Sequence, residues 1–207
     1  MKLYFARGTS SLATRIVLLE CGLPFEESEI TKVMMREGDD FRTINPLGYV
    51  PALQLDDGSI LTEGSAISQF LVDQAPEKAL APPNGTIARA RMQAWLNFLA
   101  AELHKGSLTA LFIPAMPEEA KALFRTRAGT RLAHLNAHLA NHDYLLGKEY
   151  SIADAHCFVM LSWLHWVQID IEKYPDLVRY HALVGARPAV NSALQAEHLV
   201  PWPKTVP

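Results

Sequence analysis

Apolar residues in the first part of the chain come in short runs separated by turn-forming residues. Residues 2–5 and 25–30 have the composition of short strands, and between them apolar residues recur at helical spacing over 12–19. Gly22 stands where the end of a helix favours a residue that adopts positive φ. The order strand, helix, strand predicts a βαβ unit.

A hairpin is predicted next. Asp56-Asp57-Gly58 separates two apolar runs, residues 52–55 and 59–62, and an Asp-Gly pair in that position is a strong hairpin signal. A short, irregular helix is expected over 34–44, before the hairpin. A regular helix is expected over 66–74, after it. The first part of the chain therefore has the predicted order βαβ, then ββα.

Long helical patterns fill the rest of the chain. Between the two parts, residues 76–85 contain three prolines and an Asn-Gly pair, which indicates a linker. Ser151 and Asp154 form a capping box that begins one of the helices. We therefore predict two domains, residues 1–75 and the helical part 86–207, joined by the linker 76–85. Helices are expected over residues 87–111, 117–141, 151–167, 174–185 and 188–197.

The composition and charge of the chain argue against a nucleic-acid-binding, membrane-spanning or metal-binding protein. The 207 residues are 49% hydrophobic and 20% charged, with a net charge of −3 and no basic stripe, so no nucleic-acid partner is expected. No run approaches the roughly 20 apolar residues that span a bilayer, and residues 1–5 are too short for a signal peptide. We expect a cytoplasmic protein without a membrane partner. Cys21 and Cys157 have no metal-type spacing and read as buried apolar residues; no metal is expected.

Four motifs connect this plan to a known family. They are Asn45–Leu53 (NPLGYVPAL), Leu61–Ile67 (LTEGSAI), Ser151–Asp154 (SIAD), and Trp95–Phe98 (WLNF) followed by Glu102–Lys105 (ELHK). With these motifs the chain resembles glutathione S-transferases over nearly its whole length, and the bacterial beta class in particular. The resemblance implies an α/β plus all-α fold, in which a thioredoxin-like domain precedes a helical bundle.

The resemblance implies a glutathione site on the first domain. From the residues alone Pro51 would be expected in the common trans form, but the family has a cis-proline there. Val50, which precedes it, would then pair with the cysteinyl backbone of glutathione. Glu63 suits the ammonium of the γ-glutamyl end, while the amides of Gly64 and Ser65 at a helix N-terminus suit its carboxylate.

The chain departs from the class at the position of its usual active-site cysteine. Ser10 stands there, and a serine cannot form a mixed disulfide with glutathione. A hydroxyl at this helix N-terminus can instead stabilise the glutathione thiolate. The residues leave open whether Ser10 or Ser11 does so or only caps the helix, with Thr9 a distant third candidate. Arg7, where similar chains have proline, either favours the anion or lies on the surface.

The helical part contributes further candidates through the same resemblance. His104 is a catalytic candidate that hydrogen-bonds near the sulfur or polarises the second substrate. Lys105 suits the glycine carboxylate of glutathione, and Asn97 is a further glutathione-binding candidate. Phe112 and Trp163 are expected in the cleft that binds the second substrate, between the domains.

The resulting expectation is a homodimeric glutathione transferase that conjugates glutathione, as a substrate, to small apolar electrophiles. Catalysis would rest on thiolate stabilisation and proximity, with no metal or prosthetic group. One alternative is a binding or interaction protein of the same fold without turnover. Another is a glutathione-dependent isomerase or dehalogenase. The sequence does not identify the electrophile.

Overall fold

The structure is a computed structural model, and it describes residues 1–31 and 39–200. Contacts divide the chain into two compact units. Unit 1 contains Met1–Ala81 together with the described part of the segment that begins at Arg187, and unit 2 contains Pro82–Ala186. Each unit is described by itself below.

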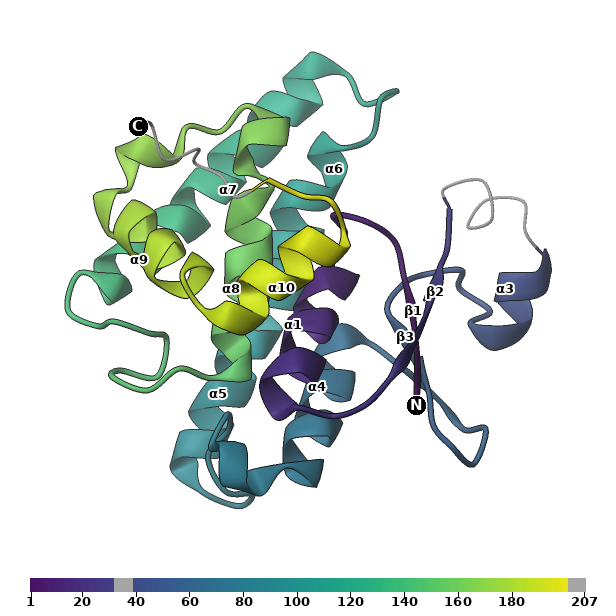
Figure 1. The fold of residues 1–207 in the computed structure, drawn as a ribbon. Helices are drawn as coiled ribbons and strands as arrows, with labels where there is room; N and C mark the ends of the chain where they lie inside the picture. Colours follow the sequence, from purple (N-terminus) through teal and green to yellow (C-terminus); the bar gives the residue numbers. More distant parts are fainter. Residues whose placement is uncertain (32–38, 201–207) are drawn as a thin grey trace. The chain divides into compact units, whose positions relative to one another are not determined.

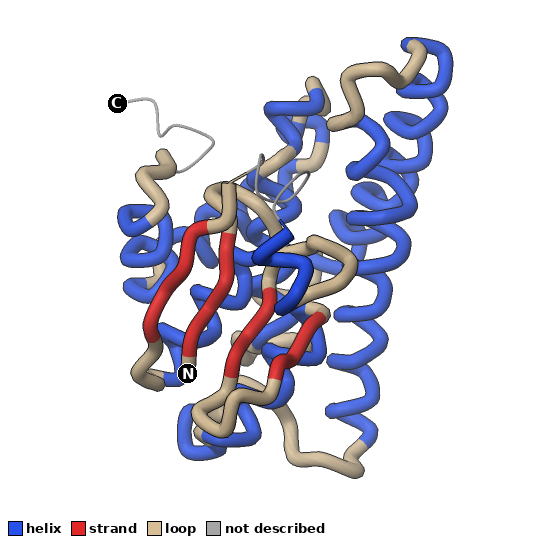
Figure 2. The backbone as a smooth tube through the Cα atoms, turned by 90° about the vertical axis from the view of Figure 1, so that its right-hand side faces the viewer, coloured by secondary structure: helices blue, strands red, loops and turns tan. Residues whose placement is uncertain are grey.

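Unit 1 is built on a four-stranded mixed sheet, whose strands lie side by side in Figure 2. Strand order is β2-β1-β3-β4; β1 pairs parallel with β2 and antiparallel with β3, and β3 pairs antiparallel with β4. Gly58 in the β3–β4 turn has a φ of 86°, and the predicted hairpin is confirmed. The strands are β1 (Lys2–Phe5), β2 (Glu26–Glu29), β3 (Ala52–Gln54) and β4 (Ile60–Thr62).

Alternating residues of the strands supply two apolar layers. Leu3 and Leu53 are opposite each other in the ladder and have no exposed surface. Tyr4 and Ala52 point to the other face, where they pack with Phe41 of helix α3 (Asp39–Ile44). The predicted irregular helix over 34–44 is thus seen from Asp39, and its earlier residues 34–38 lie outside the described residues.

Three further helices pack in unit 1. Helix α1 (Ser11–Cys21) contacts both α4 (Gly64–Gln74) and α10 (Pro188–Ala196), and α10 lies beside α1 in Figure 1. Gly22 ends α1 at a φ of 66°, as predicted, and its amide donates to the carbonyls of Leu18 and Leu19. A short 3₁₀ turn, η1 (Pro76–Lys78), follows α4. The last described helix of the chain therefore belongs to the same unit as the first.

Unit 2 is helical in its described residues. Helix α8 is its centre, because every residue from Ile152 to Leu161 is buried. Asp154 accepts hydrogen bonds from the Ser151 amide (2.8 Å) and hydroxyl (2.9 Å) and from the Tyr180 hydroxyl (2.8 Å), so the predicted capping box is confirmed. Within the described ranges, no helix is both long and apolar enough to cross a membrane. The elements are α5 (Ile87–Asn97), η2 (Phe98–Leu108), α6 (Thr109–Leu111), α7 (Glu118–Leu139), α8 (Ile152–Ser162), η3 (Leu164–Val167), η4 (Ile171–Lys173) and α9 (Pro175–Gly185).

The predicted helix over 87–111 differs from an ordinary α-helix in its middle. Element η2 is wound as a π-helix, in which hydrogen bonds span five residues. Gly106 permits this winding, because a Cβ atom there would lie 2.6 Å from the carbonyl oxygen of Ala101. The hydroxyl of Thr109 also donates to the carbonyl of His104, five residues earlier, at 3.0 Å. The spacing of apolar residues alone did not distinguish a π-helix from an α-helix.

Candidate active site

Ser10 lies at the beginning of α1, just after a sharp turn in which Gly8 has a φ of 68°. Its hydroxyl makes no capping bond to the helix. It donates instead to the carbonyl oxygen of Val50, 40 positions away, at 3.3 Å. The side chain is only partly buried. Ser10 therefore offers an accessible hydroxyl at the end of the sheet where β1 ends and β3 begins.

Ser11 has a different environment, although it is the next residue. It is fully buried, and its hydroxyl both accepts from the amide and donates to the carbonyl of Ala6, each at 3.1 Å. The hydroxyl of Thr9 lies 2.9 Å from that of Ser11 and donates to the same carbonyl at 2.8 Å. These two hydroxyls hold the turn between β1 and α1, and their bonding capacity is largely used inside the protein.

The Val50–Pro51 peptide bond is cis, as the resemblance implied. Val50 is partly exposed while Pro51 is buried. The side chain of Asn45 supports the preceding turn, since its amide donates to the carbonyl of Tyr49 at 2.7 Å and its oxygen accepts from the amide of Leu47 at 3.2 Å. The side chain of Asn45 thus stabilises the segment before β3, and Val50 at the end of that segment stays partly exposed.

Glu63 precedes α4 in an uncommon backbone conformation. Its φ of 66° and ψ of 107° lie in a region that non-glycine residues rarely adopt and that costs on the order of 1–3 kcal/mol. The carboxylate is exposed, and the backbone carbonyl accepts from Ala66 and Ile67, both at 2.9 Å. No described group accepts from the amides of Gly64 and Ser65. This helix N-terminus therefore combines two available amides with a carboxylate.

A buried ion pair lies behind the turn that carries Ser10. Glu197, at the end of α10, accepts from the Gly8 amide at 2.7 Å and from the Arg15 guanidinium at 3.1 Å. Arg15 also pairs with Glu27 and lies over the ring of Phe5, 4.2 Å from its centre. Burial raises the pKa of the Glu197 carboxyl, against the lowering effect of its two donors. The sequence analysis missed this cluster, although an arginine in the apolar pattern of α1 is a signal that a buried partner exists.

Arg7 resolves into one of its two predicted alternatives. Its guanidinium pairs with Glu29 on β2 at 2.9 Å, and both side chains are more than a third exposed. This is a surface ion pair, which typically contributes little to stability.

In unit 2, three of the predicted residues come together. The ring of His104 lies 5.0 Å from that of Trp163, and Phe112 meets Trp163 edge-on at 6.0 Å. His104 is partly buried, Trp163 is buried, and Phe112 is 44% exposed. Burial, together with the nearby charge of Lys105, lowers the pKa of His104 to about 4. Asn97 and Lys105 are exposed on the same long helical segment.

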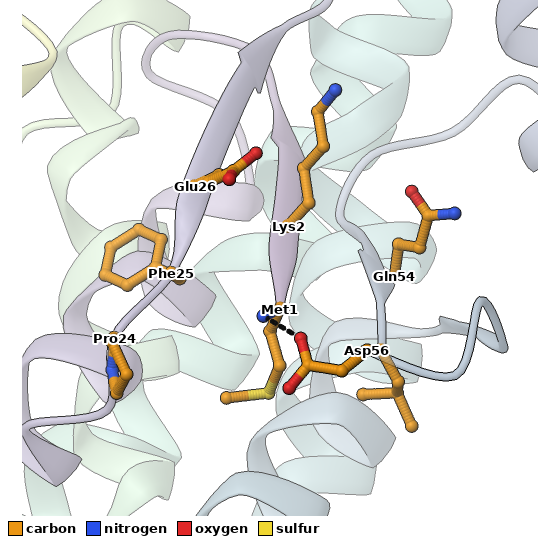
Figure 3. A pocket seen from close by; sticks show the side chains of 8 residues that line it. Met1, Lys2, Pro24, Phe25, Glu26, Gln54 and Asp56 are labelled. Atoms are coloured by element: carbon orange, nitrogen blue, oxygen red, sulfur yellow. Dashed lines mark hydrogen bonds and ion pairs between the residues drawn. The ribbon is translucent and has the colours of Figure 1, made fainter.

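A separate hollow of about 530 Å³ lies in unit 1 where β1 and β2 begin and β3 ends, as Figure 3 shows. None of the predicted site residues lines it. Its opposite charges partly neutralise each other, because the Met1 ammonium pairs with Asp56 at 2.6 Å. The lining residues are Met1, Lys2, Pro24, Phe25, Glu26, Gln54, Leu55 and Asp56.

Both halves of the chain match known family models. Residues 9–74 match the N-terminal domain of glutathione S-transferases, and residues 101–197 match the C-terminal domain. A relative named glutathione S-transferase GstA, from Escherichia coli O157:H7, is 40% identical, covering 96% of this chain and all of that protein. Glutathione S-transferase GST-4.5 of Xanthomonas campestris pv. campestris is 34% identical, with 96% and 100% covered.

Solved structures agree with the sequence comparisons. BphK, described as a bacterial glutathione S-transferase in a ternary complex, superposes with a TM-score of 0.93 at 46% identity, covering 96% of this chain and all of that one. A sphingomonad glutathione S-transferase complexed with glutathione gives 0.91 at 42% identity, covering 97% and 100%. The predicted thioredoxin-like domain followed by a helical domain is confirmed by these matches and by the sheet of unit 1. Identity, coverage and fold agree that the chain belongs to the glutathione S-transferase family.

Proposed function

We propose that this chain adds the thiolate of glutathione to a small, apolar electrophile, and that Ser10 stabilises the thiolate. The relatives named glutathione S-transferases and the solved relative that holds glutathione support this activity. The observation that carries the role of Ser10 is its accessible hydroxyl, 3.3 Å from the carbonyl of Val50.

Glutathione is proposed to bind along the accessible edge of unit 1. Its cysteinyl N–H would donate to the Val50 carbonyl and so replace Ser10 as the donor. The Ser10 hydroxyl, which has a single hydrogen, would then be released to donate to the sulfur. At the γ-glutamyl end, the amides of Gly64 and Ser65 would hold the carboxylate and Glu63 the ammonium. Pro51 would keep Val50 at the edge.

Serine in place of the usual cysteine of the beta class defines the chemistry proposed for this position. A serine hydroxyl donates a hydrogen bond to a thiolate and lowers its pKa, but it forms no disulfide. Ser11, the alternative, is buried and bonded to Ala6, which favours Ser10 as the partner of the sulfur.

The helical part is proposed to bind the electrophile. Phe112 and Trp163 would pack against it, with His104 beside them. Lys105 and Asn97 are proposed as further glutathione-binding residues, with Lys105 meeting the glycine carboxylate. We keep residues 1–75 as the glutathione-binding domain, 76–85 as the linker and 86–207 as the electrophile-binding domain. In this division the last helix of the second domain packs in unit 1.

The assembly and location remain proposals as well. The resemblance to the beta class supports a C2 homodimer, and a monomer in light scattering at micromolar concentration would contradict it. Cys21 and Cys157 are buried and unpaired, which accords with a reducing compartment such as the cytoplasm. Cell fractionation tests that location.

The test measures conjugation of glutathione to 1-chloro-2,4-dinitrobenzene by wild type, Ser10→Ala, Ser11→Ala and Ser10→Cys, alongside glutathione affinity by calorimetry. We expect Ser10→Ala to lose about a hundredfold in kcat/KM, as for removal of one donor from a developing anion, and to keep its affinity. Ser10→Cys should form a glutathione adduct visible by mass spectrometry. A wild type that binds glutathione but turns over no electrophile would instead be a binding or interaction protein.

A further inference from the structure

Asn84 differs from the other asparagines of the chain because a glycine follows it. Asn84 and Gly85 lie in the turn before α5, and both residues are exposed. An asparagine in this setting can lose ammonia without an enzyme, because the amide nitrogen of the next residue can attack its side-chain carbonyl carbon. Glycine favours the attack, since it has no Cβ atom to crowd that nitrogen.

The backbone around Asn84 forms a tight turn of four residues. Thr86 closes it, since its amide donates to the Pro83 carbonyl at 3.4 Å and its hydroxyl donates to the same oxygen at 2.8 Å. Gly85 has a φ of 79°, the value expected at the third position of a type II turn. Apart from the adjoining residues, no atom lies within 4 Å of where a Cβ atom of Gly85 would stand. The peptide group that would attack is therefore in open space.

The amide of Gly85 has no hydrogen-bond acceptor in the part of the chain that the structure describes. Its proton is therefore open to removal by hydroxide from the solvent. The turn is exposed and has a single long backbone hydrogen bond, so it opens locally at little cost. The nitrogen can reach the Asn84 side chain without disturbing the core of unit 2.

The other five asparagines lack this combination. Pro46 follows Asn45 and has no amide hydrogen. The amide of His142, which follows Asn141, donates to the Leu139 carbonyl at 3.4 Å. At the remaining three, the next amide donates to the preceding turn of a helix; these are Asn97, Asn136 and Asn191.

The β3–β4 turn contains a similar pair, Asp57-Gly58, which the fold protects. Its glycine amide donates to the Leu55 carbonyl at 3.0 Å. The Asp57 carboxylate accepts from the Ser59 amide at 2.8 Å, and hydrogen bonds from Ser59 lower its pKa. The carboxylate therefore stays ionised, which makes it a poor target for a nucleophile. Of the two exposed turns, only the one at Asn84 combines a neutral side-chain amide with an available nitrogen.

We infer that Asn84 is a site of spontaneous modification, at which the folded protein forms a succinimide and then isoaspartate or aspartate. The Gly85 nitrogen loses its proton to hydroxide and forms a bond to Cγ of Asn84. The bond from Cγ to Nδ2 breaks, and the nitrogen leaves as ammonia after taking a proton from water. Water then opens the ring, at Cγ to give aspartate or at the main-chain carbonyl to give isoaspartate. The formal net charge of −3 becomes one unit more negative.

The two products act differently on α5. Thr86 is the N-cap of this helix, its hydroxyl accepts from the Arg89 amide at 3.1 Å, and the first turn of the helix carries no acidic residue. A new carboxylate at position 84 interacts favourably with the dipole at this helix N-terminus. Isoaspartate also adds one carbon to the main chain, so the turn that holds Thr86 can no longer close in the same way.

The experiment incubates the full chain at neutral and mildly alkaline pH and follows each asparagine by peptide mass spectrometry. We expect Asn84 to convert at least tenfold faster than Asn141, a difference of ~1.4 kcal/mol in the barrier. The rate should rise in proportion to hydroxide concentration, because the Gly85 amide must lose its proton. Transfer of methyl groups from S-adenosylmethionine by an isoaspartyl methyltransferase measures the isoaspartate.

Asn84→Gln removes the reactive side chain, since a glutamine must close a larger ring and does so far more slowly. This variant should accept almost no methyl groups, whereas Asn141→Gln, the matched control, should accept as many as wild type. Methylation that persists in Asn84→Gln would place the isoaspartate elsewhere and overturn the inference. Equal conversion of Asn84 and Asn141 in wild type, a comparison that does not depend on how either variant folds, would also overturn it.

Discussion

The carboxylate of Glu197 accepts a hydrogen bond from the amide of Gly8 at 2.7 Å, although 189 positions separate the two residues. Gly8 lies in the turn that carries Ser10, and the same carboxylate holds the buried guanidinium of Arg15. The end of α10 therefore fixes the turn on which the proposed thiolate partner stands.

Replacing Glu197 with alanine should destabilise the protein strongly. The change leaves Arg15, whose side chain is 2% exposed, with Glu27 as its single carboxylate partner, and removes the acceptor of the Gly8 amide. Breaking one side of a buried pair costs about 3–5 kcal/mol, and the remaining Glu27 contact reduces that cost to ~3 kcal/mol. Urea unfolding measures it.

The control for that variant is Glu149→Ala, since Glu149 is exposed. We expect its free energy of unfolding to change by less than about 0.5 kcal/mol. Glu197→Gln, which keeps one acceptor, should fall between the two. An alanine variant as stable as the Glu149 control would mean that the ion pair contributes nothing.

Ser11→Ala should act on stability more than on catalysis. The substitution leaves the buried amide of Ala6 without its acceptor, at a cost of about 1–3 kcal/mol. Thr130→Ala removes an exposed hydroxyl that donates to a helical carbonyl at 3.3 Å, and it should be nearly neutral. Thermal unfolding compares the two, while the turnover of refolded Ser11→Ala checks the assignment of Ser10. Loss of turnover in a fully stable Ser11→Ala would reverse that assignment.

Gly106→Ala tests the π-helix. A methyl group there would lie 2.6 Å from the backbone oxygen of Ala101, so the helix must shift; overpacking of this kind costs about 1–3 kcal/mol. Gly129→Ala is the matched control in α7, because its nearest neighbour is the Tyr174 hydroxyl at 3.5 Å, an ordinary contact. In a helix interior that change should stabilise by about 0.4–1 kcal/mol. Equal effects of the two substitutions, measured by chemical unfolding, would argue against the π winding.

Stability should fall between pH 7 and pH 5. Burial lowers the pKa of His181 from 6.5 to about 4, and the nearby charge of His165 makes a smaller contribution in the same direction. Between these values the unfolded chain binds the proton that the folded chain excludes, so acid favours unfolding, by on the order of 1–2 kcal/mol at pH 5 for this residue. Below pH 4 both states are protonated and the loss is complete.

The variant that isolates this effect is His181→Phe, which keeps the stacking on Phe158. Its free energy of unfolding should drop less than that of wild type between pH 7 and 5. The raised pKa values of Asp154 and Glu197 act in the opposite direction, because the folded state then binds more protons, but they are common to both proteins and cancel in the comparison. Parallel curves for the two proteins would contradict the prediction.

Local patterns predicted most of the elements. The Asp56-Asp57-Gly58 turn and the positive φ of Gly22 follow from residue types at adjacent positions, and both are present. The cis bond before Pro51 is different, since the residues alone favour trans and only the resemblance implied cis. The π winding was missed because three or four apolar residues do not distinguish five-residue from four-residue hydrogen bonds.

Contacts between residues that are far apart in the sequence could not be predicted from the local pattern of residue types. Nothing near Arg15 or Glu197 specifies that they pair, since 182 positions separate them. The sequence could not distinguish Ser10 from Ser11 for the same reason. Neighbouring serines have identical chemistry, and what separates them is the carbonyl of Val50 and the backbone of Ala6, which the fold brings to each.

The ion pairs and hydrogen bonds that connect α1 and its preceding turn to the two ends of α10 determine when unit 1 can complete its folding during synthesis. Arg187 pairs with Glu20 at 2.6 Å, and Glu197 reaches Gly8, so both ends of α10 are anchored to the beginning of the chain. A ribosome releases the N-terminal residues first, and domains generally fold as units as they emerge. Here the first sheet and helix must wait for residues 187–197 before their packing is complete. A fragment that stops before Arg187 would leave one side of α1 uncovered, so unit 1 of this enzyme cannot be separated from unit 2 by a single cut of the chain.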